Sequence, residues 1–294
     1  MLQKLPVVFD METNDPDDYI TLLFLLGHPR IELKAVTITP GSVYQVGLVE
    51  RTLQLFGKDI PIGAYYLEHP KNCVSEWHQK VYGKIEPSDN AERGCEILLQ
   101  NCDEETTLIT GAPLKNLGLA LEFEDFKLGR LVAQGGFAGE GVVPLPDQLP
   151  KFRGKKTCPT FNLNGDIPSA LKTLETSKIK ERYFVSKNVC HGVIYDRQMN
   201  QILEEILNSS HNKSLSLKLI HKGMSHYLQK KKDGKKLHDP LAACCAIEKS
   251  IGNWSEVELF MERGEWGARL QQNTNTYIIT SYDHQQFLRV FFEH

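Results

Sequence analysis

The sequence lacks several features that would assign it to a particular class of protein. None of its apolar runs reaches the roughly 18 residues that a membrane-spanning helix needs. Its formal net charge of −3 gives no basic excess of the kind that attracts nucleic acid. The first residues, MLQKLPVVFDMETN, have neither the long apolar stretch nor the cleavage site of a signal peptide. We therefore expect a cytoplasmic protein that binds neither a membrane nor a nucleic acid polymer.

The number and spacing of the cysteines also exclude some classes of site. The chain has seven cysteines, an odd number, and no two of them form a CxxC pair. A disulfide framework or a zinc site is therefore not expected, and a reducing cytoplasm fits this usage. We interpret the cysteines as free, buried thiols.

What the 294 residues do contain is an alternation of strand-like and helix-like patterns. The predicted strands span residues 5–9, 31–39, 59–64, 106–110, 131–134, 183–186, 257–261 and 276–279. The predicted helices span residues 17–26, 45–56, 114–121, 167–174 and 238–247. This order predicts an α/β fold with a mainly parallel central sheet flanked by helices. No linker rich in proline, glycine or serine divides the chain, so we predict a single domain over residues 1–294.

Carboxylates crowd the segment directly after the first predicted strand, where sites in parallel sheets tend to form. Five acidic residues fall within nine positions: Asp10, Glu12, Asp15, Asp17 and Asp18. One or two of them would cap the following helix. Five would repel one another unless a cation lay among them. Because hard divalent cations prefer oxygen ligands, the cluster predicts a metal site.

This segment resembles the metal loop of nucleoside hydrolases, the inosine-uridine preferring N-ribohydrolases. In that superfamily a strand is followed by Asp-x-Asp, then Asp-Asp, then an apolar helix. Asp10-Met11-Glu12 stands at the first pair and Asp17-Asp18 at the second, in a form similar to a divergent branch. The second acid is Glu rather than Asp, and the loop is one residue longer. Either Glu12 or Asp15 could therefore occupy the catalytic position.

Two later segments extend the resemblance. His238-Asp239 begins a sequence similar to the family's His-Asp-Pro/Ala-Leu-Ala motif, in which Asp completes the calcium shell and His lies near the leaving base. The same residues would also suit an ordinary helix start. TGAPLKN at 110–116 resembles a family block whose backbone carbonyl binds the metal. One inserted residue leaves that carbonyl to Thr110 or Gly111.

Candidate substrate-binding residues lie in less similar segments. Gln134 precedes a Gly-Gly pair that resembles a family motif. PTFN at 159–162 resembles Ala-Glu-Phe-Asn, whose Glu and Asn bind the ribose 5′ and neighbouring hydroxyls; Asn162 matches, but Thr160 replaces Glu. Three further candidates for contacts around the base are His78, in a predicted long loop, His191 and Tyr227.

The resemblance implies calcium-dependent hydrolysis of the bond between a ribose and a nucleobase, with a small nucleoside as substrate. The implied calcium ligands are Asp10, Glu12 or Asp15, Asp18, Asp239 and a carbonyl near Thr110, with the ribose 2′- and 3′-hydroxyls. Asp10 and Glu12 are the candidate catalytic carboxylates, and Glu12 or Asp15 would take the proton of the attacking water. Asp17 would accept a hydrogen bond from a ribose hydroxyl, and His238 would protonate or bind the leaving base. Dimers or tetramers of identical subunits are also implied.

The altered 5′ segment suggests a modified substrate. A glutamate would repel a 5′-phosphate, whereas Thr160 would not, and Lys155, Lys156 or the lysines of 230–236 could attract one. We therefore hypothesise that a 5′-phosphate or another modified 5′ group is tolerated. The basic run at 229–236 is predicted to be a solvated, mobile loop, with a lid over the site as the alternative.

Two other functions are open. FDMET at 9–13 resembles the first motif of proofreading-type 3′–5′ exonucleases, which would use Asp10 and Glu12, and His191 and Asp196 match a later motif. That reading leaves Asp17-Asp18 and His238-Asp239 unexplained. A catalytically inactive, nucleoside-binding homologue is the other alternative, since fold does not imply function.

Overall fold

Eleven strands form one sheet in the computed structural model, which describes residues 4–209 and 214–293. Their order is β4-β3-β2-β1-β5-β6-β8-β13-β11-β12-β7, and neighbours from β4 to β13 run parallel. The last three strands pair antiparallel. The strands are β1 Leu5–Met11, β2 Ile31–Ile38, β3 Ile62–Ala64, β4 Glu92–Arg93, β5 Thr107–Thr110, β6 Leu128–Gln134, β7 Thr157–Cys158, β8 Ile179–Val185, β11 Gly252–Glu262, β12 Glu265–Leu270 and β13 Thr276–Tyr282. The predicted fold class, a mainly parallel sheet flanked by helices, is confirmed.

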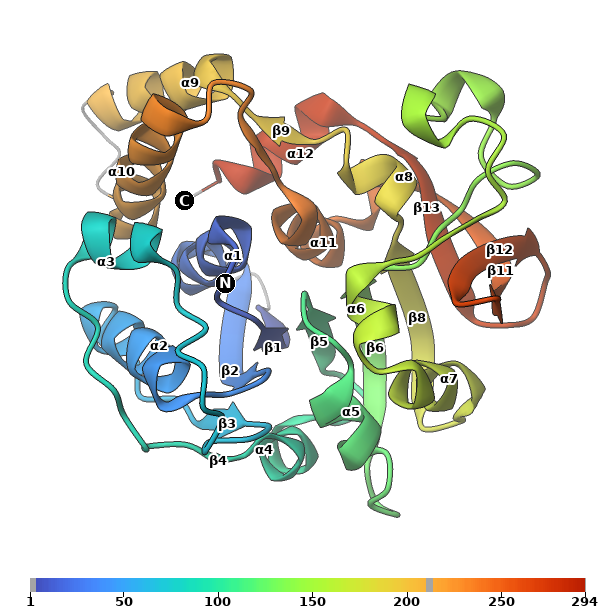
Figure 1. The fold of residues 1–294 in the computed structure, drawn as a ribbon, viewed down its shortest axis with the longest axis horizontal. Coiled ribbons are helices and arrows are strands. Elements are labelled where there is room, and N and C mark those ends of the chain that lie inside the picture. The colour runs from blue at the N-terminus through green and yellow to red at the C-terminus, as the bar shows by residue number, and fades with distance from the viewer. Residues whose placement is uncertain (1–3, 210–213, 294) are drawn as a thin grey trace.

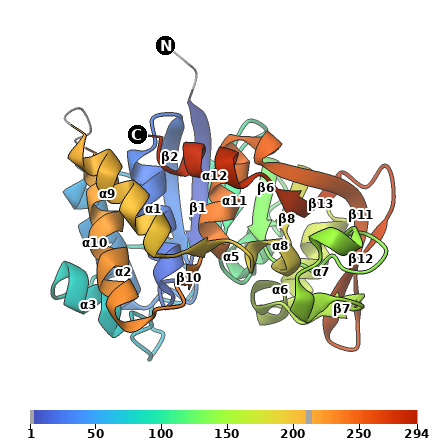
Figure 2. The same cartoon turned by 90° about the horizontal axis from the view of Figure 1, so that it is seen from above.

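Helices cover both faces of this sheet (Figure 1). The larger core lies beneath α1, α2, α10, α11 and α12, and the second core lies beneath α4, α5 and α7. The helices are α1 Pro16–Gly27, α2 Val43–Leu55, α3 Glu76–Tyr82, α4 Gly94–Asn101, α5 Lys115–Ala120, α6 Phe161–Gly165, α7 Ile167–Glu175, α8 Lys187–Cys190, α9 Arg197–Asn208, α10 Leu215–Lys230, α11 His238–Ile247 and α12 His284–Phe291. Two short strands, β9 Ile194–Tyr195 and β10 Lys235–Lys236, pair separately. Figure 2 places α3, α9 and α10 at one end of the molecule and β7 and β12 at the other.

The central strand β1 determines where the site forms. Val7, Val8 and Phe9 are fully buried because helices pack on both faces of the sheet. Asp10, the next residue, is in register with Thr37 of β2 on one side and Thr110 of β5 on the other. The carboxyl ends of these strands are therefore level, and the loops that follow them meet at one edge.

The structure corrects two local expectations. His78 is buried in helix α3 rather than exposed in a long loop, because it packs against Tyr19 and Trp77. The basic run at 229–236 is only partly a solvated loop: it starts in α10 and ends in β10, where Lys235 is buried. All seven cysteines are free, and five of them are buried. Among the described residues, no helix is both long and apolar enough to cross a membrane.

Candidate active site

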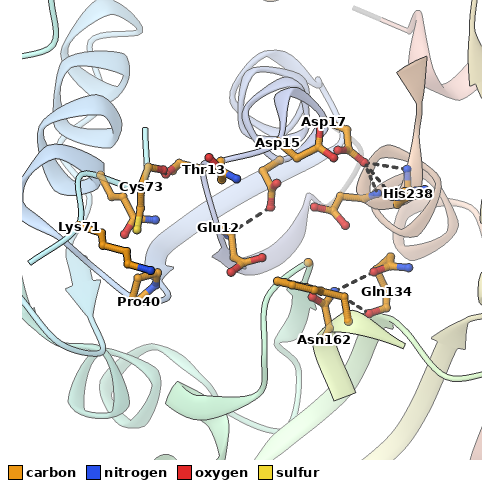
Figure 3. Close-up of a pocket in the computed structure, with 16 residues that line it drawn as sticks. Glu12, Thr13, Asp15, Asp17, Pro40, Lys71, Cys73, Gln134, Asn162 and His238 are labelled. Atoms are coloured by element: carbon orange, nitrogen blue, oxygen red, sulfur yellow. Dashed lines mark hydrogen bonds and ion pairs between the residues drawn. The ribbon is translucent and has the colours of Figure 1, made fainter. Parts of the chain in front are cut away.

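A pocket of about 580 Å³ opens at the carboxyl edge of the sheet (Figure 3). Glu12 lies at its centre, with Asp15 and Asp17 above it and Asn162 and Gln134 below. His238 closes one side, while Lys71 and Cys73 lie opposite. Eight of the predicted site residues line this pocket: Glu12, Asp15, Asp17, Asp18, Gln134, Asn162, His238 and Asp239.

Asp10 lies beneath the pocket and is completely buried. Its carboxylate accepts hydrogen bonds from the hydroxyl of Thr37 (2.6 Å), the amide of Asn116 (2.9 Å) and the hydroxyl of Thr110 (3.3 Å). Burial raises the pKa of Asp10 to about 6, although these three donors favour the ionised form. The donors fix the carboxylate in one orientation at the end of β1.

Three further carboxylates crowd the floor of the pocket. The backbone N–H of Glu12 donates to Asp18 (3.2 Å), so the loop holds both acids close together. Burial, followed by the charge of Asp10, raises the pKa of Glu12 to about 7. Burial and the charges of Asp239 and Asp17 raise the pKa of Asp18 well above its usual range. The pKa of Asp239 is raised in the same way, by burial and by the charge of Asp17.

Gly111 allows the backbone after β5 to approach this cluster. A Cβ atom at this position would lie 2.1 Å from a carboxylate oxygen of Asp239. Any side chain here would therefore displace that carboxylate. Of the two candidates for a metal-binding carbonyl, Gly111 lines the pocket, whereas Thr110 lies behind it with its hydroxyl on Asp10.

Asp17 has a different environment from the one the resemblance implied. One of its oxygens accepts from the N–H groups of His238 (2.9 Å) and Asp239 (3.4 Å), at the start of α11. The other lies 2.8 Å from the ammonium of Lys235. Burial opposes ionisation, but Lys235 and His238 outweigh it and lower the pKa of Asp17. Asp17 thus joins α1 to α11, and it also lines the pocket.

Lys235 also lies 3.0 Å from Asp15, whose side chain is 52% exposed. Burial alone would lower the pKa of Lys235, but Asp17 and Asp15 raise it. Asp15 is therefore held at the pocket rim by a cation, whereas Glu12 lies beside Asp10 on the floor. The two alternatives for the catalytic position, Glu12 and Asp15, therefore lie in different parts of the pocket.

One ring nitrogen of His238 has no hydrogen-bond partner within residues 4–209 and 214–293. Its Nε2 is buried without a hydrogen-bond partner, while Nδ1 faces Asp17 at 3.7 Å. Its ring stacks on that of His191, with centroids 5.0 Å apart. Burial lowers the pKa of His238 to about 4, which outweighs the opposing effect of Asp17. The imidazole is consequently neutral near pH 7.

Asn162 and Gln134 form a polar pair across the pocket. The amide of Asn162 donates to the side-chain oxygen of Gln134 (2.7 Å) and to its carbonyl (3.0 Å). Thr160 is buried outside the pocket lining, and its hydroxyl has no hydrogen-bond partner. His191, His78 and Tyr227 do not line the pocket either. His191 still contacts the pocket through His238, and Tyr227 lies half-buried on α10.

Several residues at the site were not found from sequence. Lys235 was read as one of a run of solvated charges, although it is the buried partner of two acids. Thr37 on β2 and Asn116 on α5 orient the carboxylate of Asp10. Asp196 does not belong to the site: it caps α9 by accepting from the N–H of Met199 (2.9 Å). Asp196, the acid of the motif that resembled an exonuclease sequence, therefore has a structural role as a helix cap.

The fold is that of nucleoside hydrolases. A structure from Bacillus anthracis, described as an inosine-uridine preferring nucleoside hydrolase, has a TM-score of 0.68 at 18% identity and covers 99% of this chain and 98% of that chain. A purine-preferring ribonucleoside hydrolase from Gardnerella vaginalis (TM-score 0.66, 15% identity) and a plant nucleoside hydrolase (0.67, 17%) each cover 97% of this chain and 96% of their own.

The family follows from the sequence as a whole. The family model of inosine-uridine preferring nucleoside hydrolases matches residues 7–289, so the chain belongs to this family. An uncharacterized protein of Aquifex aeolicus (strain VF5) is 28% identical over 282 residues, which is 92% of this chain and 93% of the relative. The predicted superfamily is therefore confirmed.

Proposed function

We propose that this protein hydrolyses the N-glycosidic bond of a ribonucleoside, or of one that is modified or phosphorylated at the 5′ carbon, with calcium as its cofactor. The observation that carries the proposal is the convergence of Glu12, Asp18 and Asp239 on one pocket, above Asp10 and beside His238. We also propose a single domain, a cytoplasmic location and a homodimer or homotetramer, as the resemblance implies.

The donor set fits a hard divalent cation. All the groups that converge are oxygen donors, and burial and mutual repulsion keep the pKa values of Glu12, Asp18 and Asp239 raised. Asp10, Glu12, Asp18, Asp239 and a carbonyl at Thr110 or Gly111 would hold the ion. When bound, calcium would supply electrostatic activation of a water molecule and a point of attachment for the ribose 2′- and 3′-hydroxyls.

In this proposal Glu12, rather than Asp15, accepts the proton of the attacking water. Glu12 lies at the centre of the pocket and has a pKa of about 7, which suits a base that works near neutral pH. Asp10 is held by three donors and serves as a fixed charge. Asn162 and Gln134 present polar groups to the sugar. The reaction passes through a positively charged sugar, which the acidic floor stabilises.

His238 acts on the leaving base in this proposal. Because its imidazole is neutral near pH 7, it stabilises the leaving base through a hydrogen bond rather than as an imidazolium acid. Its buried, unpartnered Nε2 is the atom available for this contact. Asp17 holds the residue in place through its backbone N–H, so its role is to position His238 and Asp239 rather than to bind ribose.

The test is release of free base from a panel of purine and pyrimidine ribonucleosides and their 5′-monophosphates, with calcium and with a chelator. Labelled single-stranded DNA with magnesium or manganese is assayed alongside. Base release that the chelator abolishes is the expected result. Shortening of the DNA without base release would establish the exonuclease instead. Nucleoside binding without release of base would identify an inactive homologue.

Metal binding should depend on pH in a defined direction. The pKa values of Asp10 (about 6) and Glu12 (about 7) are raised chiefly by burial, above the values near 4 of an unfolded chain. Between about pH 4 and pH 7 the metal-free folded state therefore binds more protons than the unfolded state, so its stability falls as pH rises. A cation relieves the repulsion of the ionised acids.

We expect calcium at about 100 times its dissociation constant to raise Tm by about 5 °C near pH 8. At the same calcium concentration the rise should be clearly smaller near pH 5, where the carboxyls are protonated. Differential scanning calorimetry with calcium and with chelator measures both values. A larger rise near pH 5 would contradict the assignment of these acids as ligands.

A further inference from the structure

Three lysines surround His191 without a carboxylate partner, and we call them the lysine cluster: Lys151, Lys187 and Lys236. The ammonium of Lys151 lies 2.6 Å from Nδ1 of His191. Lys187, at the start of α8, donates to the backbone carbonyl of Pro159 (2.8 Å). Lys235 is paired with two acids, but within residues 4–209 and 214–293 no ion pair joins any lysine of the cluster to a carboxylate.

The charges of the cluster act on His191 and on one another. Burial lowers the pKa of His191 to about 3, and the ring of His238 and the charges of all three lysines contribute to this shift. The pKa of Lys151 is itself lowered, first by burial and then by Lys236 and Lys187. An anion placed among these groups would remove the repulsion.

A metal ion is the other ligand that this region suggests. Ligand atoms of Cys190, His191 and His238 lie within 4.8 Å of one another, which suits a soft cation. However, the ammonium of Lys151 already lies against one ring nitrogen of His191, and the charges of Lys236 and Lys187 act on the same ring. The lysine cluster would repel a cation here, so the observations favour an anion.

The cluster borders the proposed active site. The ring of His238, which lines the pocket, stacks on His191 at 5.0 Å, with an angle of 23° between the planes. On the other side, the carbonyl that Lys187 binds belongs to Pro159, three residues before the pocket residue Asn162. Between them lies Thr160, only 3% exposed, whose hydroxyl has no partner.

We propose that the lysine cluster binds a phosphate carried on the 5′ carbon of the substrate, so that 5′-phosphorylated ribosyl compounds are the preferred substrate class. This inference rests on the proposed function. There the 2′- and 3′-hydroxyls would be held at the proposed metal site and the bond at C1′ is cut, so C5′ is the remaining carbon that can carry a phosphate. The phosphate itself takes no part in the reaction. Of the lysines that the sequence suggested for this role, only Lys236 belongs to the cluster.

The experiment is calorimetric titration of the full chain, in saturating calcium, with ribose 5-phosphate, ribose and inorganic phosphate. These probes do not depend on the unknown base preference. We expect ribose 5-phosphate to bind at least about tenfold more tightly than ribose. This preference should shrink as salt is raised, because ions screen exposed charges. Inorganic phosphate should bind weakly, since it lacks the sugar.

Variants identify the cations responsible. Lys151→Met, Lys187→Met and Lys236→Met should each weaken ribose 5-phosphate binding by about two- to fivefold. The triple variant should lose the preference but still bind ribose, and this retained binding shows that it is folded. Lys58→Met, which removes an exposed lysine after α2, is the matched control and should leave both affinities unchanged.

Three results would overturn the inference. Wild-type protein could bind ribose and ribose 5-phosphate equally, or the triple variant could keep the preference, which would point to another cation such as Lys71 at the pocket. Inorganic phosphate that binds as tightly as ribose 5-phosphate would indicate an anion site unconnected to the sugar. If no base is released from any compound but the preference depends on the cluster, the proposed hydrolysis fails and the phosphate subsite stands.

Discussion

Replacement of Glu12 by glutamine should reduce the rate of base release by about 10²- to 10⁴-fold, the range expected for loss of a general base. Gln keeps an oxygen donor of nearly the same shape, so the loss would reflect the missing proton acceptor. Asp15→Asn is the matched variant, because Asp15 was the alternative from sequence and lies at the rim beside Lys235. Its effect should stay within about fivefold, as expected for a partly exposed ion pair.

Initial rates at saturating calcium, together with calcium affinity by calorimetry, separate the two roles. A loss of rate in Glu12→Gln without a comparable loss of calcium affinity would support the base. The opposite pattern, with Asp15→Asn inactive and Glu12→Gln close to wild type, would transfer the role to Asp15. In that case the Lys235 contact of Asp15 would have to open when metal and substrate bind.

Replacement of Lys235 by methionine should produce the largest loss of stability among the charged residues of the site. It removes the ammonium 2.8 Å from Asp17, whose side chain is only 3% exposed, and leaves a buried charge with backbone donors alone. Loss of one partner of a buried pair costs about 3 kcal/mol or more. For a chain of this size this corresponds to a fall in Tm of about 6 °C.

Two further variants make this result specific. The double variant Asp17→Asn/Lys235→Met should recover part of the lost stability, because no unpaired charge remains. Lys230→Met, an exposed lysine at the end of α10, should change the free energy of unfolding by no more than about 0.5 kcal/mol. Thermal or urea unfolding of the four proteins measures these changes in stability. A Lys235→Met protein as stable as wild type would show that Asp17 does not depend on this ion pair.

The parts of the site that follow from sequence are those set by local pattern. The acids after β1 could be predicted because they follow a clear strand pattern. The His238-Asp239 pair could be predicted because it begins a clear helix pattern. Helix α11 spans the predicted residues 238–247. The register of Asp10 with Thr37 and Thr110 could also be expected in outline, because parallel strands end at one edge of the sheet. The single domain over residues 1–294 stays a prediction.

The parts that did not follow depend on contacts between distant segments. Lys235 lies in a run of lysines, and only its position between Asp15 and Asp17, about 220 residues earlier, makes it a buried partner. The lysine cluster gathers residues from η2 (Pro150–Phe152), α8 and β10. The contact of Asp17 with the amide groups at the start of α11 also joins segments about 220 residues apart. A run of charges or a short motif does not show which distant residue a side chain will contact in the folded protein.

The cap that Asp17 provides for α11 also has a consequence for synthesis of the chain. Asp17 leaves the ribosome early, whereas its partners Lys235, His238 and Asp239 emerge only after four-fifths of the residues have been made. Until then, Asp15 and Asp17 lack the ammonium group that lies beside both of them in the folded protein. The N-terminal segment therefore cannot reach its final state on its own, and a product truncated before Lys235 would keep this segment unpaired and exposed to proteases.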